Sequence, residues 1–264
     1  MATETDRPGP RILALWGAPR SRSTAFARMM AERGDHTTVH EPFSHLLDFG
    51  EAEVGDRKVH SEAELIAALR ELAQDGPVFF KDTTDFHYPG LLADESFLRE
   101  AAHTFIIRHP AEAITSHLAL NPNLTRDEVG FSRLTEIFDA VRAAVGATPP
   151  VIDSDDLLAH PEETVRVYCG LVGIPFLPEA LHWESGMREE WQRTARWHAS
   201  TSQTTGFVSR ASDEAAAPEP GRSGGGSPKA TAGSQDPRVA GFVEFHLPHY
   251  QRLLAERMVL TSPE

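Results

Sequence analysis

The sequence predicts an α/β fold with three layers, in which a central, mostly parallel β-sheet is flanked by helices. Short apolar runs recur along the chain, and amphipathic segments with helical periodicity separate most of them. The alternation is typical of βαβ units, whose right-handed crossovers place helices on both faces of a sheet. With 264 residues, 40% of them hydrophobic, the chain is long enough for one large α/β domain.

The strands are predicted from runs that are apolar or rich in β-branched residues, at residues 12–16, 37–40, 78–81, 104–108 and 151–153. Helical patterns cover residues 23–33, 62–74, 95–102, 111–120, 126–145 and 161–171. Pro161 suits the first position of the last of these helices, and Gly173 ends it. A closing helix at residues 239–258 carries apolar residues that favour docking on the domain. Ligands of such folds collect at the carboxyl ends of the strands.

The domain organisation follows from a change in composition. We expect a flexible N-terminus at residues 1–10 and a single domain over residues 11–264. Residues 211–237 are rich in Ala, Pro, Gly and Ser and lack the apolar side chains that would offset the cost of ordering them. They predict a mobile loop, which is either a lid over the site or a plain linker to the closing helix.

Charge and composition exclude several classes of partner. A net charge of −14 disfavours nucleic acid or an anionic membrane as the main partner, although a local basic site for an anion is compatible with it. The chain has no apolar run of membrane-spanning length and no signal-peptide pattern, so we expect a cytoplasmic protein. Cys169, the only cysteine, is interpreted as a buried small side chain. The sequence leaves open whether the protein forms a homo-oligomer or binds a partner protein.

The run at residues 12–16 leads through Gly17 into a polar turn that resembles a phosphate-binding loop. Against a Walker A loop, Gly17 and Thr24 fill the first glycine and the last hydroxyl positions, but Arg22 replaces the second glycine and Ser23 the lysine. Without that lysine, hydrolysis of ATP or GTP is disfavoured. The free N–H groups of the following helix still favour an anion. The alternative is an ordinary strand-to-helix turn with solvated arginines.

A second candidate phosphate site lies at the end of the fourth predicted strand. Arg108 ends this strand, and Ser116 follows on the helix that Pro110 helps to start. A guanidinium offers two parallel donors to a phosphate, and a hydroxyl can add another. Taken alone, this Arg-His-Pro corner could also be a structural turn.

These residues resemble the sulfotransferases that use 3′-phosphoadenosine 5′-phosphosulfate (PAPS). The stretch Pro19-Arg20-Ser21-Arg22-Ser23-Thr24 is similar to the family's loop for the 5′-phosphosulfate, with Arg22 in place of the usual glycine. Arg108-His109-Pro110 and Ser116 resemble the element for the 3′-phosphate. The resemblance covers about residues 11–180, and the family's Gly-rich C-terminal clamp is not clear at residues 221–226. It implies a P-loop-like sulfotransferase architecture of the bacterial small-molecule type.

Two further residues, with two histidines in reserve, are predicted to act on the acceptor and the leaving group. Glu41, which follows the second predicted strand in a His-Glu-Pro-Phe sequence, is the expected general base, with His40 and His87 as reserves. Lys81 ends the third strand and resembles a lysine that neutralises the leaving phosphate. The alternatives are a capping or salt-bridged carboxylate for Glu41 and a solvated lysine for Lys81.

The resemblance therefore implies transfer of a sulfuryl group from PAPS to a hydroxyl, or as a second choice an amine, of a small or carrier-bound molecule. The second product is adenosine 3′,5′-bisphosphate (PAP). No metal is expected, because the thirteen histidines show no metal-ligand spacing. Two alternatives stay open, a P-loop small-molecule kinase and a catalytically silent nucleotide-binding partner of another enzyme. The acceptor pocket is expected from residues 43–49, 87–92, 117–131 and 183–197.

Overall fold

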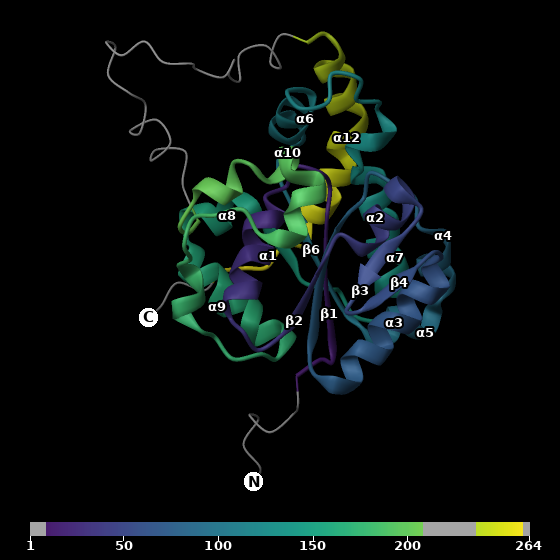
Figure 1. The fold of residues 1–264 in the computed structure, drawn as a ribbon. Helices are drawn as coiled ribbons and strands as arrows, with labels where there is room; N and C mark the ends of the chain where they lie inside the picture. Colours follow the sequence, from purple (N-terminus) through teal and green to yellow (C-terminus); the bar gives the residue numbers. More distant parts are fainter. Residues whose placement is uncertain (1–8, 208–235, 261–264) are drawn as a thin grey trace.

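The computed structural model describes residues 9–207 and 236–260, and its centre is a five-stranded, wholly parallel sheet in the order β2-β5-β1-β6-β7. Helices cover both faces of this sheet (Figure 1). The predicted α/β class and three-layer arrangement are confirmed. The strands are β1 (Ile12–Gly17), β2 (Thr37–His40), β5 (Val78–Thr83), β6 (Ala102–Ile107) and β7 (Val151–Asp153).

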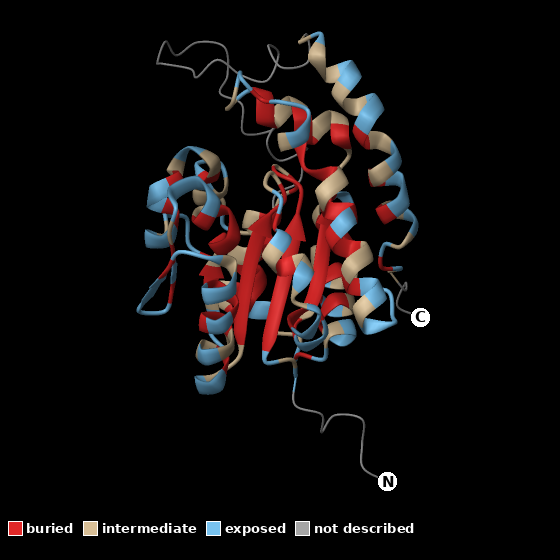
Figure 2. Ribbon diagram, turned by 90° about the vertical axis from the view of Figure 1, so that its right-hand side faces the viewer, coloured by how far each residue is buried: buried red, intermediate tan, exposed pale blue. Residues whose placement is uncertain are grey.

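Both faces of the sheet are buried, which explains the continuous apolar runs. In β1, Ile12, Ala14 and Trp16 belong to one hydrophobic cluster, while Leu13 and Leu15 belong to a second cluster on the opposite face. Successive strand side chains alternate between faces, so a central strand needs apolar residues at every position. The buried strands run through the middle of the molecule, and exposed residues lie on the outer sides of the helices (Figure 2).

The helices divide between the two faces. The second cluster is covered by α1 (Ser23–Glu32), α8 (Ser154–Ala159) and α9 (Pro161–Val172). The first is covered by α2 (Pro42–Phe49), α3 (Glu62–Asp75), α4 (Pro89–Ala93), α5 (Glu95–Glu100), α6 (Pro110–Leu118), α7 (Phe131–Val145) and α12 (Arg238–Ala255). The remaining elements are the hairpin of β3 (Ala52–Val54) and β4 (Arg57–Val59), the helix α10 (Ala195–His198), and the 3₁₀ turns η2 (Asp127–Val129), η3 (Pro178–Leu181), η4 (Glu189–Thr194) and η5 (Thr201–Gln203).

Two of the predicted helices differ clearly from the elements of the structure. The helix predicted at residues 126–145 is two elements, η2 and α7, separated at Gly130, whose φ is +86°. A Cβ at this position would lie 2.7 Å from the Thr84 carbonyl oxygen, so the close approach of β5's end requires glycine. The helix predicted at residues 95–102 ends at Glu100, because β6 already begins at Ala102. The strand predicted at residues 104–108 is β6, which ends at Ile107, so Arg108 lies just beyond the strand instead of ending it.

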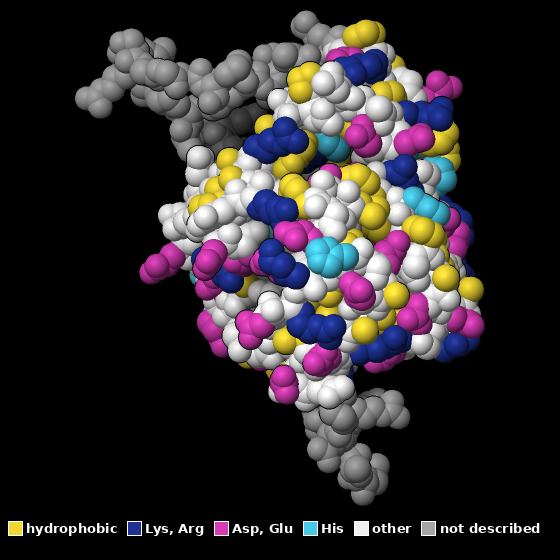
Figure 3. All heavy atoms as spheres, turned by 45° about the vertical axis from the view of Figure 1, so that its right-hand side comes forward, with side chains coloured by type: hydrophobic (Ala, Val, Ile, Leu, Met, Phe, Trp, Pro, Cys, Tyr) yellow, Lys and Arg dark blue, Asp and Glu magenta, His cyan; other side chains and the backbone are white. Residues whose placement is uncertain are grey.

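Two predicted segments fall almost wholly outside the described residues. These are the N-terminus at residues 1–10 and the loop at residues 211–237. Cys169 is buried as expected, at 1% exposure. On the face drawn in Figure 3, acidic and basic side chains are interspersed. Among the described helices, none combines the length and the apolar character needed to cross a bilayer.

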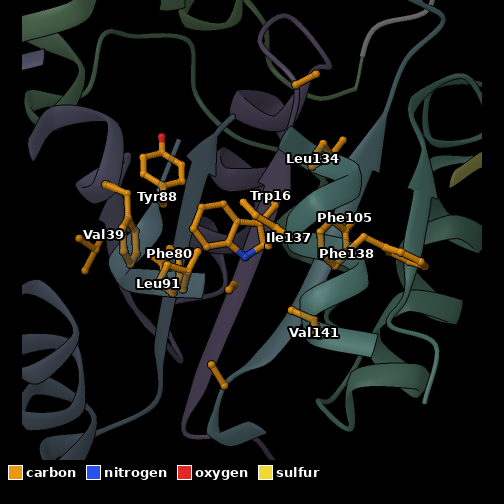
Figure 4. Packing of buried hydrophobic residues seen from close by; sticks show 14 of the residues in the cluster. Trp16, Val39, Phe80, Tyr88, Leu91, Phe105, Leu134, Ile137, Phe138 and Val141 are labelled. Atoms are coloured by element: carbon orange, nitrogen blue, oxygen red, sulfur yellow. The ribbon is translucent and has the colours of Figure 1, made fainter. Parts of the chain in front are cut away.

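Trp16 is the centre of the larger core cluster. Its ring centroid lies 5.4 Å from that of Phe43, 5.5 Å from that of Phe80 and 5.9 Å from that of Tyr88. Figure 4 shows Trp16 between Phe80 on one side and residues of α7 on the other. Its indole Nε1–H donates to Nδ1 of buried His103 at 2.9 Å. His103 must therefore be neutral, with its proton on Nε2.

We expect His103 to make stability depend on pH. Burial lowers the pKa of His103 to about 4, so between about pH 6.5 and 4 the unfolded chain binds a proton that the folded chain does not, and stability falls as the pH falls. In His103→Gln, whose side-chain oxygen can still accept from Trp16, the slope of unfolding free energy between pH 6 and 4.5 should be shallower by up to about 1.4 kcal/mol per pH unit. Urea unfolding at several pH values measures this slope, with His160→Gln on the surface as the control. Equal slopes in all three proteins would contradict the prediction.

Candidate active site

A cavity of about 940 Å³ opens at the carboxyl ends of the strands. The connections that follow β1, β2, β5 and β6 all contribute to its wall. β1 lies between β5 and β6, so the chain crosses to opposite sides of β1 at this edge, which is where open α/β sheets bind ligands. The wall includes most of the predicted site residues, namely Arg20, Arg22, Ser23, Thr24, Glu41, Lys81, Arg108 and Ser116.

The loop after β1 has the geometry of an anion-binding turn. Arg20 and Arg22 both adopt left-handed backbone conformations, with φ of 68° and 66°. Between them, Ser21 is fully buried, and its Oγ has no hydrogen-bond partner in the described part of the chain. Ser23 and Thr24 begin α1, whose first turn has N–H groups without helical partners. The free N–H groups of this turn fit an anionic ligand. Ser23 and Thr24 line the cavity, whereas Ser21 is not part of its wall.

The side chain of Arg22 connects the loop with α8 and α6, the helices that follow β7 and β6. Its Nη1 lies 2.6 Å from Oδ1 of Asp155 and 3.1 Å from Oγ of Ser154, and its Nη2 lies 3.5 Å from Oε2 of Glu112. The left-handed backbone, which glycine adopts freely, costs a non-glycine residue about 1–2 kcal/mol. These contacts to α8 and α6 offset that cost, so an arginine can replace the glycine while still lining the cavity.

The two predicted phosphate sites come together through Arg20. Its Nε donates to Ser116 Oγ at 3.1 Å, and its carbonyl oxygen accepts from Arg108 Nη1 at 3.1 Å. Arg108 also pairs with Glu112, at 2.9 Å from Nη2 to Oε2. Burial and the charge of Arg108 lower the pKa of Arg20 to about 10, so Arg20 stays protonated at neutral pH. This end of the cavity is positively charged.

Glu41 and Lys81 form a buried ion pair. Parallel pairing sets His40 beside Lys81, and the Glu41 N–H donates to the Lys81 carbonyl oxygen at 2.7 Å. The Lys81 ammonium donates to Glu41 Oε1, and the two residues are 2% and 8% exposed. Burial raises the pKa of Glu41, but the charge and hydrogen bond of Lys81, together with His40 and His198, outweigh burial and hold this pKa well below its usual value. Glu41 is therefore a carboxylate next to a buried cation.

Asp82 fixes the turn that carries Glu41. Its carboxylate accepts from the N–H of Phe43 at 2.6 Å, from the N–H of Ser44 at 3.1 Å and from the Ser44 hydroxyl at 2.5 Å. These groups lie at the start of α2, where negative charge is favourable, but burial and the charge of Glu41 raise the pKa of Asp82 to about 7. Glu41 itself has a left-handed backbone with φ of 48°. Asp82 thus holds a strained turn against the end of β5.

The two histidines named as alternative bases lie in different places. His87 is exposed, with Nε2 3.4 Å from Glu136 Oε1, and it is not part of the cavity wall. His40 lies beside Glu41, with Nε2 3.6 Å from Glu41 Oε2. His40 also contacts His198, which is 1% exposed and lines the cavity. Sequence reasoning missed His198, because no local motif marks it and it lies 174 residues from its partner Thr24.

His40, Glu41 and His198 have potential metal-ligand atoms within 4.8 Å of one another. Each of these groups also has a hydrogen-bond partner. Lys81 contacts the Glu41 carboxylate, and Nε2 of His198 lies 3.0 Å from Thr194 Oγ1 and 3.1 Å from His40 Nε2. The buried lysine disfavours a second cation at this point. We therefore interpret the cluster as a hydrogen-bond network.

The rest of the cavity wall is rich in carboxylates. Asp48 on α2, Asp85 after β5 and Glu128 on η2 line it together with Arg196. Burial and the charges of Glu41 and Asp48 raise the pKa of Asp85 to about 6, and burial with Glu41 raises that of Asp48. Thr83 donates to Asp85 at 2.7 Å. Two ends of opposite charge thus share one cavity.

Comparison with known families gives a match over most of the chain. A family model described as "Sulfotransferase domain" matches residues 10–223. Two proteins of Arabidopsis thaliana, called branched-chain-amino-acid aminotransferase-like proteins 2 and 1, are each 28% identical over 214 residues. The match covers 75% and 76% of this chain but only 36% and 37% of those proteins, so the chain spans about a third of their length.

Two solved structures are also similar. One is a sulfotransferase domain from the curacin biosynthetic pathway, with 14% identity, a TM-score of 0.44, and coverage of 89% of this chain and 98% of that one. The other is a sulfotransferase domain from the Synechococcus PCC 7002 olefin synthase, with 15% identity, a TM-score of 0.47, and coverage of 92% and 96%.

Proposed function

This chain belongs to the sulfotransferase domain family, and from that premise we propose that it transfers a sulfuryl group from PAPS to a hydroxyl of a small or carrier-bound acceptor. The observation that carries this proposal is the joining of two anion sites, the loop after β1 and the Arg108–Ser116 corner, through Arg20. A donor with a 5′-phosphosulfate and a 3′-phosphate needs two such sites. A triphosphate needs one.

The residues divide into binding and reacting groups. Arg20, Ser23, Thr24 and the first turn of α1 hold the 5′ side, and Arg108 and Ser116 hold the 3′-phosphate. Ser21, which is buried and outside the cavity wall, receives no binding role. The free N–H groups in the first turn of α1 and the positive charge of this end fit these groups. Arg22 braces the loop and adds positive charge beside it.

The transfer itself needs one proton acceptor and one cation. The acceptor oxygen forms a bond to sulfur while the bond from sulfur to the 5′-phosphate oxygen breaks, and the hydroxyl proton goes to Glu41. Lys81 stabilises the negative charge that grows on the leaving phosphate. Both groups line the cavity, so both are within reach of a donor and an acceptor that bind there. His87 receives no role, since it is outside the cavity.

The decisive experiment is calorimetry with PAP and with ATP–Mg²⁺, followed by transfer of labelled sulfate to a panel of hydroxylated compounds. We expect PAP to bind and ATP–Mg²⁺ to bind more weakly. Binding of ATP–Mg²⁺ alone would replace this proposal by the kinase alternative. Binding of PAP without transfer to any acceptor, when the donor is intact, would favour the silent partner.

The carboxylates of the cavity wall predict a preference among acceptors. Asp48, Asp85 and Glu128 oppose an anionic acceptor and attract a cationic one. Among alcohols of similar size, we expect kcat/KM to be highest for those with an ammonium group and lowest for those with a carboxylate. Asp48→Asn should narrow the difference without changing PAP affinity. A preference for anionic alcohols would contradict the prediction.

A further inference from the structure

His198 connects the loop after β1 with the neighbourhood of Glu41. It lies at the end of α10, in a segment formed by η4, α10 and η5 (residues 189–203) that we call the cover segment. α10 lies beyond the ends of the strands, near α1 (Figure 1). His198 Nδ1 is 3.3 Å from Thr24 Oγ1, and its Nε2 is 3.1 Å from His40 Nε2. The cover segment contacts the loop a second time, where the Trp197 carbonyl oxygen accepts a hydrogen bond from Arg20 Nη1 at 2.7 Å.

The ring of His198 is neutral at neutral pH, so only one of its nitrogens carries a proton. Burial, together with the charges of Lys81 and Arg20, lowers the pKa of His198 to about 4, and burial lowers that of His40 as well. A neutral imidazole has one donor and one acceptor nitrogen. The contacts of His198 therefore allow two arrangements.

In one arrangement His198 Nδ1–H donates to Thr24 Oγ1, and Nε2 accepts from His40 Nε2–H or from the Thr194 hydroxyl. In the other, Nε2 holds the proton, and the Thr24 hydroxyl donates to Nδ1. Only the first arrangement leaves the Thr24 proton available to an anion at the start of α1. An anion bound there selects it, because Thr24 cannot donate its single proton twice.

We propose that His198 is a positioning residue for the donor: by donating from Nδ1 to Thr24, it directs the Thr24 hydroxyl proton toward the 5′-phosphosulfate. This proposal rests on the proposed function, since it assigns the anion to the donor. It also gives the cover segment a role in donor binding, because His198 and the Trp197 carbonyl both contact loop residues.

The test is a double-mutant cycle on PAP affinity. His198→Phe keeps an aromatic ring next to Trp191, whose ring centroid lies 5.4 Å from that of His198, but removes both nitrogens. Loss of one oriented hydrogen bond should weaken PAP binding about five- to tenfold. His198→Asn, whose amide N–H can replace Nδ1–H, should bind PAP within about threefold of the wild type. Thr24→Val removes the shared partner.

If His198 acts through Thr24, then His198→Phe adds less than about twofold to the loss already caused by Thr24→Val. Additive losses, or no rescue by Asn, would overturn the proposal and leave His198 as a packing residue. The KM for the acceptor should change little in His198→Phe. If the wild-type protein does not bind PAP, the proposed function itself is wrong. This outcome is distinct from wild-type binding with additive losses, which contradicts only the role of His198.

A measurement on the wild-type protein covers the case in which a variant does not fold. In protein with ¹⁵N-labelled histidine, the His198 resonances report which nitrogen is protonated. With PAP bound, we expect a protonated Nδ1 and an unprotonated Nε2. The reverse pattern in the PAP complex would overturn the proposal.

Discussion

Glu41→Gln is expected to lower kcat by about 10²- to 10⁴-fold, the usual contribution of a general base. The amide keeps the shape of the side chain but cannot take the acceptor proton, and Lys81 loses its negative partner. PAP affinity should stay within a few-fold of the wild-type value, because Glu41 belongs to the reacting group and not to the two anion sites. Steady-state rates of sulfate transfer, together with calorimetry of PAP, measure both quantities.

The control for Glu41→Gln is Asp48→Asn, which makes the same chemical change on another carboxylate of the cavity wall. It should leave kcat for an uncharged acceptor nearly unchanged. Because Glu41→Gln leaves a buried, unpaired Lys81, its melting temperature also has to be measured. A folded Glu41→Gln protein with wild-type kcat would remove Glu41 from the reaction.

Arg108→Ala is expected to weaken PAP binding by about ten- to hundredfold, which corresponds to about 1.5–3 kcal/mol for hydrogen bonds to a charged group. The loss should be specific to the 3′-phosphate. Adenosine 5′-phosphosulfate, which has no 3′-phosphate, should bind wild type and variant equally well. Calorimetry with both ligands measures the difference.

The control for Arg108→Ala is Arg142→Ala, which removes a half-exposed arginine that pairs with Glu256 away from the cavity. Its effect on PAP binding should be negligible. If Arg108→Ala weakens the binding of both ligands by the same factor, then Arg108 supports the loop through the Arg20 carbonyl oxygen and does not bind the 3′-phosphate.

Much of the fold could be predicted, because hydrophobic patterns report burial directly. β2 and β7 have the predicted bounds, and β1 differs by one residue. The hydrophobic pattern gave wrong helix bounds where contacts with distant parts of the chain override the local helical preference. Gly130 interrupts an otherwise helical pattern because the end of β5 approaches it, and this approach has no trace in the neighbouring sequence. Helix α2 was missed because its eight residues are held by Asp82, which is distant in the chain.

Most residues of the candidate site could also be found in the sequence. The loop at Pro19–Thr24, the Arg108–Ser116 corner, Glu41 and Lys81 all follow strands, and the ends of parallel strands meet at one edge of the sheet. His87 follows the same strand as Lys81 but is not near the others. It lies four residues past the end of β5, where the chain has already turned toward α4.

The α/β class, the approximate positions of the strands, and a basic loop beside a second arginine site could all be read from the sequence, because burial and strand ends have local signals. The pairing of these groups, in contrast, depends on the packing of the whole domain. Arg22 turns to Asp155 instead of lying free, Glu41 is a carboxylate held by Lys81, and His198 reaches Thr24 across 174 residues. These pairings depend on distances between segments that are far apart in the chain. Such distances are set by the packing of the whole domain, so no single stretch of sequence contains them.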